Sequence, residues 1–235
     1  DDTFGRVFAR LDAGQFQGCF MSWVQAVFEV TKGQVIAVDG KSARHSYDKS
    51  KGKEAIHLVS AWATENHVVL GQRAVAEKSN EITAIPELLR LLDVSGCIVT
   101  IDAMGCQTEI AAQIVAQEAD YVLAVKGNQA HLQEDTALFF HLAQQNDFQK
   151  VTYTYARTVN KDHGRVEVRQ CWAVSGQDNL HFLREADRWP GLQTLAMVTS
   201  QRQVNGQTTS ETRYYITSLP NDAARILHAV RSHWG

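Results

Sequence analysis

VIAVD at residues 35–39 and CIVTID at residues 97–102 are two short apolar runs that each end in an aspartate. Continuous β-branched runs of this length predict strands buried on both faces, at the centre of a parallel or mixed sheet. Such sheets bind ligands at the carboxyl ends of neighbouring strands, where Asp39 and Asp102 would lie. Two adjacent carboxylates repel each other unless a cation lies between them, so the pair predicts a hard metal ion and phosphate chemistry. The alternative is that each aspartate simply begins a turn.

Length and composition predict a soluble chain with a sizeable core. The sequence has 235 residues, of which 44% are hydrophobic, enough for one elaborated domain or two small ones. No apolar run is long enough to cross a membrane and no basic-then-apolar signal segment is present, so we expect a cytoplasmic protein. The four cysteines have no CxxC spacing and no histidine pair joins them, so free thiols are expected rather than zinc ligands.

The basic residues are gathered in two clusters, although the net charge of −3 argues against a generic nucleic-acid binder. Basic loops around an acidic centre would hold a polyanion over a metal site. The alternative is that both clusters are solvated loops. The first cluster contains Lys41, Arg44, Lys49, Lys51 and Lys53, offset by Asp48 and Glu54. The second contains Arg157, Lys161, His163, Arg165 and Arg169, opposed only by Asp162 and Glu167.

Hydrophobic periodicity predicts a helical segment over residues 1–32 and an α/β core over residues 33–147. An aromatic stripe in the first segment is typical of helices that pack on a core. In the core, the expected order is three strands, helix, strand, helix, strand and helix, with an antiparallel hairpin at the edge. This is a ribonuclease-H-like order, in which the first and fourth strands are neighbours. The expected strands are residues 35–39, 55–64, 68–76, 97–102 and 121–125.

Residues 148–219 have the pattern of a β-rich insertion that lies on this core. Polar and apolar residues alternate, and Asn205-Gly206 is the strongest hairpin signal in the chain. A further helix begins within residues 220–235. The expected fold class is therefore α/β, a mixed sheet with flanking helices and a β-rich insertion. The four strands expected in the insertion are residues 151–159, 165–174, 194–204 and 208–217.

Five short motifs occur in a specific order along the chain. They are VDGK at residues 38–41, TIDAMGCQ at 100–107, LAVKGNQ at 123–129, HGR at 163–165 and RSHWG at 231–235. In this order they resemble the DDE transposases of bacterial insertion sequences, most closely the H-repeat-associated transposases. The resemblance covers essentially the whole chain.

The resemblance implies a ribonuclease-H-like catalytic domain that cleaves and transfers DNA strands at transposon ends. Mg²⁺, with Mn²⁺ as a substitute, would be the cofactor, and Asp39 and Asp102 would be its ligands and the first two acids of a catalytic triad. The third acid, a glutamate, is expected just after the His233-Trp234-Gly235 step, where this sequence ends. We therefore expect the chain as given to be inactive. The implied partner is double-stranded DNA, bound by a homodimer in the bacterial cytoplasm, at the nucleoid.

Seven residues are candidates for DNA contacts. Two of them, Lys126 and Asn128, follow a predicted strand and would steady phosphates, unless they form an ordinary helix-entry turn. Arg165 and Arg169 share one strand face and would follow a DNA backbone, unless they are exposed cations without a role. The full set is Lys41, Arg44, Lys126, Asn128, His163, Arg165 and Arg169.

Two other functions remain open on the sequence. One is a non-catalytic DNA-binding remnant of a decayed insertion element, which would keep the fold and the basic loops. The other is a metal-dependent phosphatase or nuclease of small substrates, which fits the aspartate pair but not the basic loops and the large insertion. A DNA-binding protein should lose affinity steeply as salt rises, and a small-substrate enzyme should not.

Overall fold

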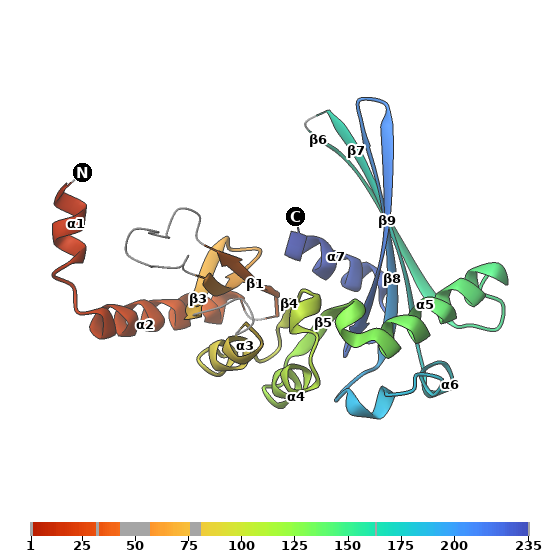
Figure 1. Ribbon diagram of the computed structural model, residues 1–235, viewed down its shortest axis with the longest axis horizontal. Coiled ribbons are helices and arrows are strands. Elements are labelled where there is room, and N and C mark those ends of the chain that lie inside the picture. The colour runs from red at the N-terminus through yellow and green to blue at the C-terminus, as the bar shows by residue number, and fades with distance from the viewer. Residues whose placement is uncertain (1, 32, 43–56, 76–80, 163, 235) are drawn as a thin grey trace.

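Nine strands form one sheet in the computed structural model, which describes residues 2–31, 33–42, 57–75, 81–162 and 164–234 (Figure 1). The strands are β1 (Val35–Ser42), β2 (His57–Ala63), β3 (Val68–Val75), β4 (Ile98–Ile101), β5 (Asp120–Val125), β6 (Tyr153–Asp162), β7 (Arg165–Ser175), β8 (Thr194–Val204) and β9 (Gln207–Thr217). The helices are α1 (Asp2–Phe8), α2 (Ala13–Thr31), α3 (Glu81–Arg90), α4 (Thr108–Ala116), α5 (Ala130–Gln145), α6 (Gln177–Leu180) and α7 (Ala223–Trp234), with short 3₁₀ turns η3 (Ala103–Gly105), η4 (Gly127–Gln129) and η5 (Ala186–Arg188).

The strand order of the sheet is β3-β2-β1-β4-β5-β9-β8-β7-β6. β1, β4 and β5 are parallel to one another, and the other neighbouring pairs are antiparallel. The first and fourth strands are therefore neighbours, and β2 and β3 form an antiparallel hairpin at the edge, as the sequence pattern predicted. The result is a mixed α/β fold with a large, mostly antiparallel sheet.

The four strands expected between residues 148 and 219 are present as β6 to β9. The expectation that these strands lie on the core as an added layer is wrong. β9 pairs with β5 from Val122↔Thr217 to Val125↔Tyr214, so the four strands extend the same sheet. Asn205 and Gly206 connect β8 to β9 with φ values of 49° and 79°, the left-handed backbone that a tight hairpin turn needs. The far ends of these strands rise well beyond the other strands (Figure 1).

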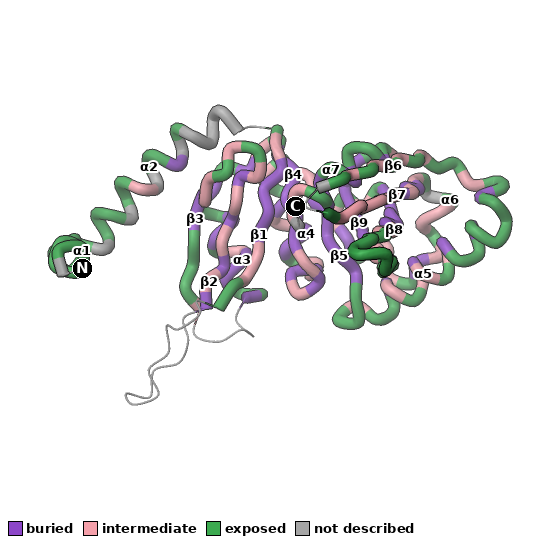
Figure 2. Tube along the Cα trace, turned by 90° about the horizontal axis from the view of Figure 1, so that it is seen from above, coloured by how far each residue is buried: buried purple, intermediate pink, exposed green. Residues whose placement is uncertain are grey.

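Helices cover both faces of the sheet. One apolar layer joins the sheet to α3, α4 and α5, and the other joins it to α7. The first four residues of β1 and all of β4 are buried, because these central strands have an apolar layer on each face. α7 touches β1 and β4 as well as β6 and β7, so it lies in the hollow of a curved sheet (Figure 2). This helix connects the two halves of the fold.

The N-terminal segment packs on the core less fully than its aromatic stripe predicted. In α2, Val24 is buried and Phe20 contacts the core, but the side chains of Phe16 and Trp23 are each 52% exposed. Phe4 in α1 is 70% exposed. The two helices extend away from the sheet (Figure 2). Within the described residues, no helix combines the length and apolar character that a membrane crossing requires.

The cysteines are free, as the sequence predicted. Cys97, Cys106 and Cys171 are buried in the core, and Cys19 is exposed. Burial raises the pKa of the Cys106 and Cys171 thiols to about 12, which keeps both protonated and unreactive.

Candidate active site

Asp39 and Asp102 lie side by side just beyond the last paired residues of two parallel strands, β1 and β4. The last paired residues of β1 and β4 are Val38 and Ile101. Asp39 and Asp102 follow directly after them in the two chains, so they are neighbours across the two strands. Side chains alternate along a strand, so both aspartates project on the face that carries Thr100 and is covered by α7. Both are half-buried. The structure thus brings together the two residues that the sequence predicted as metal ligands.

The two aspartates have different local environments. Asp39 lies inside β1, which continues to Ser42, so the alternative of a turn at Asp39 is wrong. Asp102 does begin a turn, since its Oδ1 accepts a hydrogen bond of 3.1 Å from the backbone nitrogen of Met104 at the start of η3. This bond orients the Asp102 carboxylate while leaving it at the strand end.

Two amide side chains from the next strand end hold the turn that carries Asp102. The Asn128 Nδ2 donates to the carbonyl oxygen of Ala103 at 2.6 Å, and the Gln129 Nε2 donates to that of Cys106 at 2.9 Å. Asn128, predicted as a DNA contact, therefore has its amide nitrogen bonded to the protein backbone. Lys126 lies at the end of β5 and is exposed, as predicted. The role of Gln129 was not predicted, although it lies within the KGNQ motif.

His233 brings the end of α7 to the same site. Its Nδ1 lies 2.9 Å from the Oγ1 of Thr100, a buried residue of β4. Burial lowers the pKa of His233, while the nearby carboxylates of Asp39 and Asp102 raise it; burial prevails. His233 is therefore a neutral imidazole at pH 7 in the field of both aspartates. The side chain of Trp234 lies outside the described residues.

The aspartate pair fits a hard divalent ion in its chemistry. Carboxylate oxygens are the ligands that Mg²⁺ and Mn²⁺ prefer. Within the described part of the chain, no group of three or more His, Cys, Asp and Glu side chains is arranged to hold a metal ion. The Nζ of Lys41 lies 3.5 Å from the Oδ2 of Asp39, but its side chain is 83% exposed, so the pairing is weak. Two protein ligands would leave the other coordination positions to water and phosphate.

The basic residues that the sequence predicted as DNA contacts differ in how the structure pairs them and in whether it describes them. Arg165 and Arg169 do share a face of β7, but Glu167 lies between them and pairs with both, at 3.5 and 2.7 Å. Their charge is therefore partly neutralised, by one of the two acids that the sequence placed in opposition to this cluster. Arg44 and His163 lie outside the described residues.

A polar chain, buried at His57 and Glu81, supports β1 on its other face. The Oγ of Ser42 lies 2.8 Å from the Nδ1 of His57, and the His57 Nε2 bonds the Glu81 carboxylate at the start of α3. That carboxylate packs directly on Gly40, where a Cβ atom would overlap it. The arrangement holds the segment next to Asp39 against α3, and no sequence motif predicted it.

Comparisons with known proteins show the family of this chain. A family model for the transposase DDE domain matches residues 30–235. "Putative transposase YncI" of Escherichia coli O157:H7 is 43% identical over all of this chain, which spans 60% of its length. "H repeat-associated putative transposase YhhI" of Escherichia coli strain K12 is 41% identical over 99% of this chain, which spans 61% of its length.

A third protein is similar in sequence, and one solved structure overlaps this chain. A Xanthobacter autotrophicus protein encoded in the dhlA 3′ region is 44% identical over 94% of this chain and 72% of its own length. A cryo-EM structure of a piggyBac transposase synaptic complex with hairpin DNA overlaps 86% of this chain and 38% of its own, with 10% identity and a TM-score of 0.42, too low to support an argument. The family match covers most of the chain, including both aspartates. The chain therefore belongs to the transposase DDE-domain family.

Proposed function

We propose that this chain is the catalytic part of a DNA transposase, which cleaves and joins DNA strands at transposon ends with a divalent metal ion. The observation that carries the proposal is the adjacency of Asp39 and Asp102 just beyond the last paired residues of β1 and β4, in a member of the transposase family. The metal is Mg²⁺, with Mn²⁺ as a substitute, and the partner is double-stranded DNA.

The proposed core is ribonuclease-H-like. In support, an antiparallel hairpin precedes two parallel strands, and β1 lies between β2 and β4. Ligands of open α/β sheets bind outside the carboxyl ends of the strands, which is where the two aspartates lie. Residues 148–219 would then be an insertion that widens the sheet beyond β5.

In the proposed reaction, Asp39 and Asp102 hold the metal ion against a backbone phosphate of DNA. When bound, the metal would lower the pKa of an attacking water or 3′-hydroxyl and offset charge on the leaving oxygen. Asn128 and Gln129 fix the turn that carries Asp102, so this carboxylate keeps its orientation. Neutral His233 closes the site from the α7 side without adding a charge that would repel the metal.

A second candidate is DNA binding without catalysis. It is favoured by one observation: in the part of the chain that the structure describes, no group of three or more His, Cys, Asp and Glu side chains is arranged to hold a metal ion. The two candidates differ in what metal does: catalysis needs a metal between the aspartates and DNA, whereas simple binding does not.

Fluorescence anisotropy with a labelled DNA duplex tests the proposal, measured with and without Mn²⁺ over a range of salt. The wild-type chain should bind DNA with steep salt dependence and should bind it more tightly when Mn²⁺ is present. Asp39→Asn should keep the salt dependence and lose the Mn²⁺ effect, while Asp93→Asn, a change at an exposed loop residue, should keep both. Equal Mn²⁺ effects in all three proteins would refute the assignment of the aspartates. Salt-dependent binding without any Mn²⁺ effect would support the second candidate.

A further inference from the structure

The sheet face under α7 changes character along β7, β8 and β9. Near the helix it is small and apolar, as at Cys171, Ala196 and Val198, which pack on α7. Farther along the strands the residues on this face become charged or hydroxyl-bearing. Register places Glu167 opposite Arg202, and Arg169 opposite Ser200. The far half of this face therefore has the composition of a polar binding surface rather than a core.

Two hollows open on this charged half. The first has a volume of about 370 Å³, and its charged lining is Glu167, Arg169, Arg202, Glu211, Arg213 and Arg231. The second has a volume of about 270 Å³ and is lined by Asn160, Lys161, Arg165, Glu167 and Arg231. Glu167 and Arg231 border both hollows, so the two are adjacent. Among the described residues, six cationic and two acidic side chains line the two hollows.

The arginines are held in place from within the protein. Glu167, only 13% exposed, pairs with Arg169 at 2.7 Å, with Arg165 at 3.5 Å and with Arg202 at 3.7 Å. One carboxylate cannot neutralise three guanidinium groups. The Nη1 of Arg169 is buried and has no hydrogen-bond partner within the described residues. Arg169 also lines the first hollow, and a buried charged donor without an acceptor is costly, so the field of an anion in the hollow would stabilise this guanidinium.

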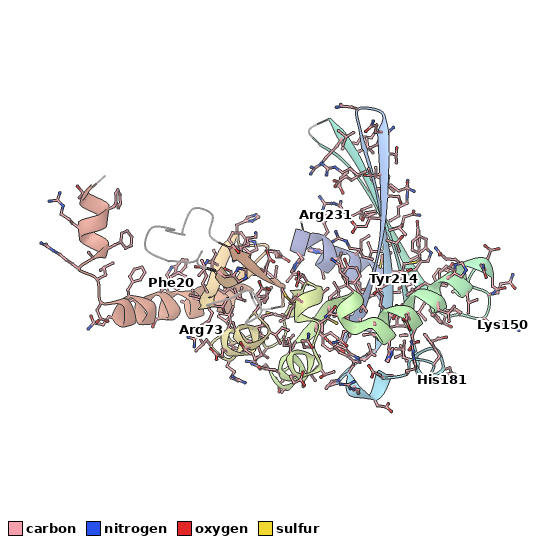
Figure 3. The ribbon with its side chains drawn as sticks, viewed as in Figure 1. Phe20, Arg73, Lys150, His181, Tyr214 and Arg231 are labelled. Carbon is pink, nitrogen blue, oxygen red and sulfur yellow. The ribbon has the colours of Figure 1, made fainter. Side chains whose placement is uncertain are left out.

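Arg231 connects this surface to the aspartate pair. It lies on α7 at the foot of the projecting strands (Figure 3). Its Nη1 donates to the Oδ1 of Asn160 on β6 at 2.6 Å, which fixes the guanidinium between the two hollows. His233 follows two residues later, about 3 Å along the helix axis, and turns to the other side toward β4. A strand of nucleic acid could therefore pass from the hollows around the end of α7 to the aspartates.

We propose that the two hollows bind two backbone phosphates of DNA, with Arg202, Arg213 and Arg231 as contact residues besides Arg165 and Arg169. The inference rests on the proposed function, since it takes DNA as the substrate. Phosphate suits the site because the planar guanidinium donates two parallel hydrogen bonds to phosphate oxygens. Free phosphate offers the same oxygens, so the test must separate it from DNA.

The test measures the affinity for a labelled duplex against salt concentration for Arg202→Gln, Arg231→Gln and Arg188→Gln. Arg188 is the matched control, an exposed arginine paired with Glu185 and away from the hollows. Each of the first two variants should lower the slope of log affinity against log salt by roughly 0.9 and weaken binding about three- to tenfold near 0.1 M salt. Arg202→Lys, which keeps the charge, should restore most of the slope. Circular dichroism would confirm that each variant is folded.

A parallel calorimetric titration with inorganic phosphate separates the two ligands. If Arg202→Gln and Arg231→Gln lose phosphate binding while their duplex slopes equal that of the Arg188 control, the hollows take free phosphate and the inference is wrong. Equal slopes in all variants without phosphate binding would also overturn it. If the wild-type chain binds no duplex at all, the proposed function is wrong. That result differs from the case in which the wild type binds DNA and only the assignment of the hollows is wrong.

Discussion

His233 in the last turn of α7 is hydrogen-bonded to Thr100 in β4, with 2.9 Å between Nδ1 and Oγ1. Thr100 precedes Asp102 by two residues, so this bond joins the C-terminal helix to the strand that delivers a proposed metal ligand. The contact spans 133 residues of sequence. The position of α7 over the aspartates therefore depends on a polar contact as well as on the apolar layer beneath the helix.

Removing the threonine hydroxyl should weaken this connection. Thr100→Val keeps the side-chain volume but leaves the Nδ1 of His233 without this partner in a half-buried position. We expect a loss of about 1–3 kcal/mol in the free energy of unfolding, measured by urea denaturation. The control Thr152→Val, at an exposed position, should change it by less than about 0.5 kcal/mol. Equal effects of the two substitutions would show that the bond contributes nothing.

The pH dependence of stability should report the environment of His233. Because the pKa of His233 is lowered in the folded chain, the unfolded chain takes up the proton first as the pH falls below the ordinary value of 6.5. Stability is therefore complete above pH 6.5 and decreases below it, with a slope of at most about 1.4 kcal/mol per pH unit for one group. Thermal unfolding of wild type and His233→Gln from pH 7.5 to 5 should show this decrease only in the wild type. His181→Gln, at an exposed position, should behave as wild type; a decrease of the same size in His233→Gln would contradict the assignment.

Gly105 should not tolerate a side chain. It ends η3, the turn that Asp102 begins, and a Cβ atom there would overlap the Cγ2 of Ile101 and lie 3.1 Å from the Cδ1 of Ile85. Gly105→Ala should cost about 1–3 kcal/mol of stability through overpacking and should also reduce metal binding, because the turn orients Asp102. Gly127→Ala is the control, since its Cβ would meet only the Gln133 Oε1, at 4.0 Å, an ordinary van der Waals contact. Unchanged stability and metal binding in Gly105→Ala would show that the turn adjusts freely.

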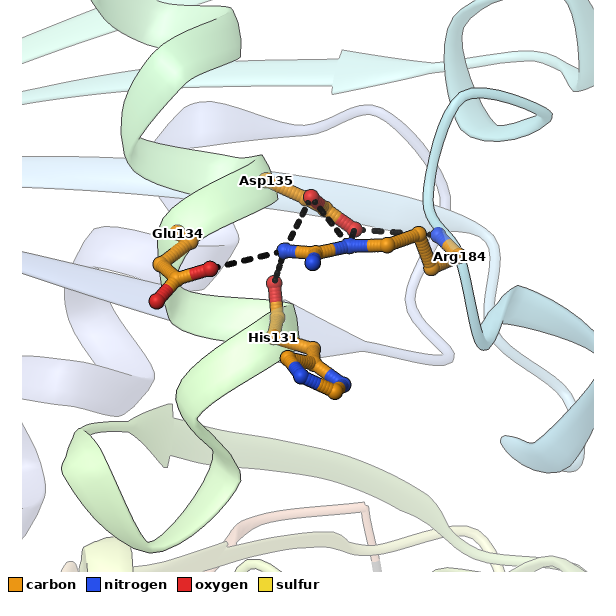
Figure 4. Close-up of polar contacts among 4 residues, drawn as sticks. All are labelled: His131, Glu134, Asp135 and Arg184. Atoms are coloured by element: carbon orange, nitrogen blue, oxygen red, sulfur yellow. Dashed lines mark hydrogen bonds and ion pairs between the residues drawn. The ribbon is translucent and has the colours of Figure 1, made fainter.

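Arg184, in the loop after α6, forms hydrogen bonds with residues of helix α5 (Figure 4). It donates to both oxygens of Asp135, to Glu134 and to the carbonyl oxygen of His131. Burial raises the pKa of Asp135, but the hydrogen bonds from Arg184 outweigh it and leave the pKa below its ordinary value. The contribution of this pair is therefore present at neutral pH and is lost as the pH falls below about 4.

Arg184→Gln should loosen the loop while leaving global stability almost unchanged, because the Arg184 side chain is 48% exposed and its ion pairs are screened. Hydrogen exchange should show faster exchange of the backbone amides of residues 181–189. Arg188→Gln provides the comparison, since it removes an exposed arginine of the same loop that pairs only locally with Glu185. Equal exchange rates of these amides in the two variants would show that Arg184 does not stabilise the loop.

Hydrophobic runs and turn residues in the sequence predicted those parts of the fold that depend on short stretches of chain. The buried run of β4, the hairpin turn at Asn205 and the neighbouring positions of β1 and β4 all agree with the structure. The pairing of β5 with β9 could not be predicted, because the partner of an alternating strand is chosen by packing over long sequence distances. For the same reason the sequence suggested a separate layer where the structure has one continuous sheet.

The sequence predicted the two aspartates of the candidate site, but it did not predict all the contacts of the residues around them. Asp39 and Asp102 were found because each follows a buried strand. Glu167 was predicted to oppose the second basic cluster, and the structure shows it paired with both Arg165 and Arg169. The bond of Asn128 to the Asp102 turn left no signal in the spacing, because it joins two loops brought together only by the parallel strands.

The most direct test of the central claim is a calorimetric titration of Mn²⁺ into the chain in the presence of a short DNA duplex. Wild type is compared with the double variant Asp39→Asn, Asp102→Asn and with the matched control Asp93→Asn, Asp187→Asn, which changes two exposed aspartates. We predict that wild type and control bind Mn²⁺ alike and that the double variant binds it at least about tenfold more weakly. Equal Mn²⁺ binding by all three proteins would contradict the claim that Asp39 and Asp102 form the metal site.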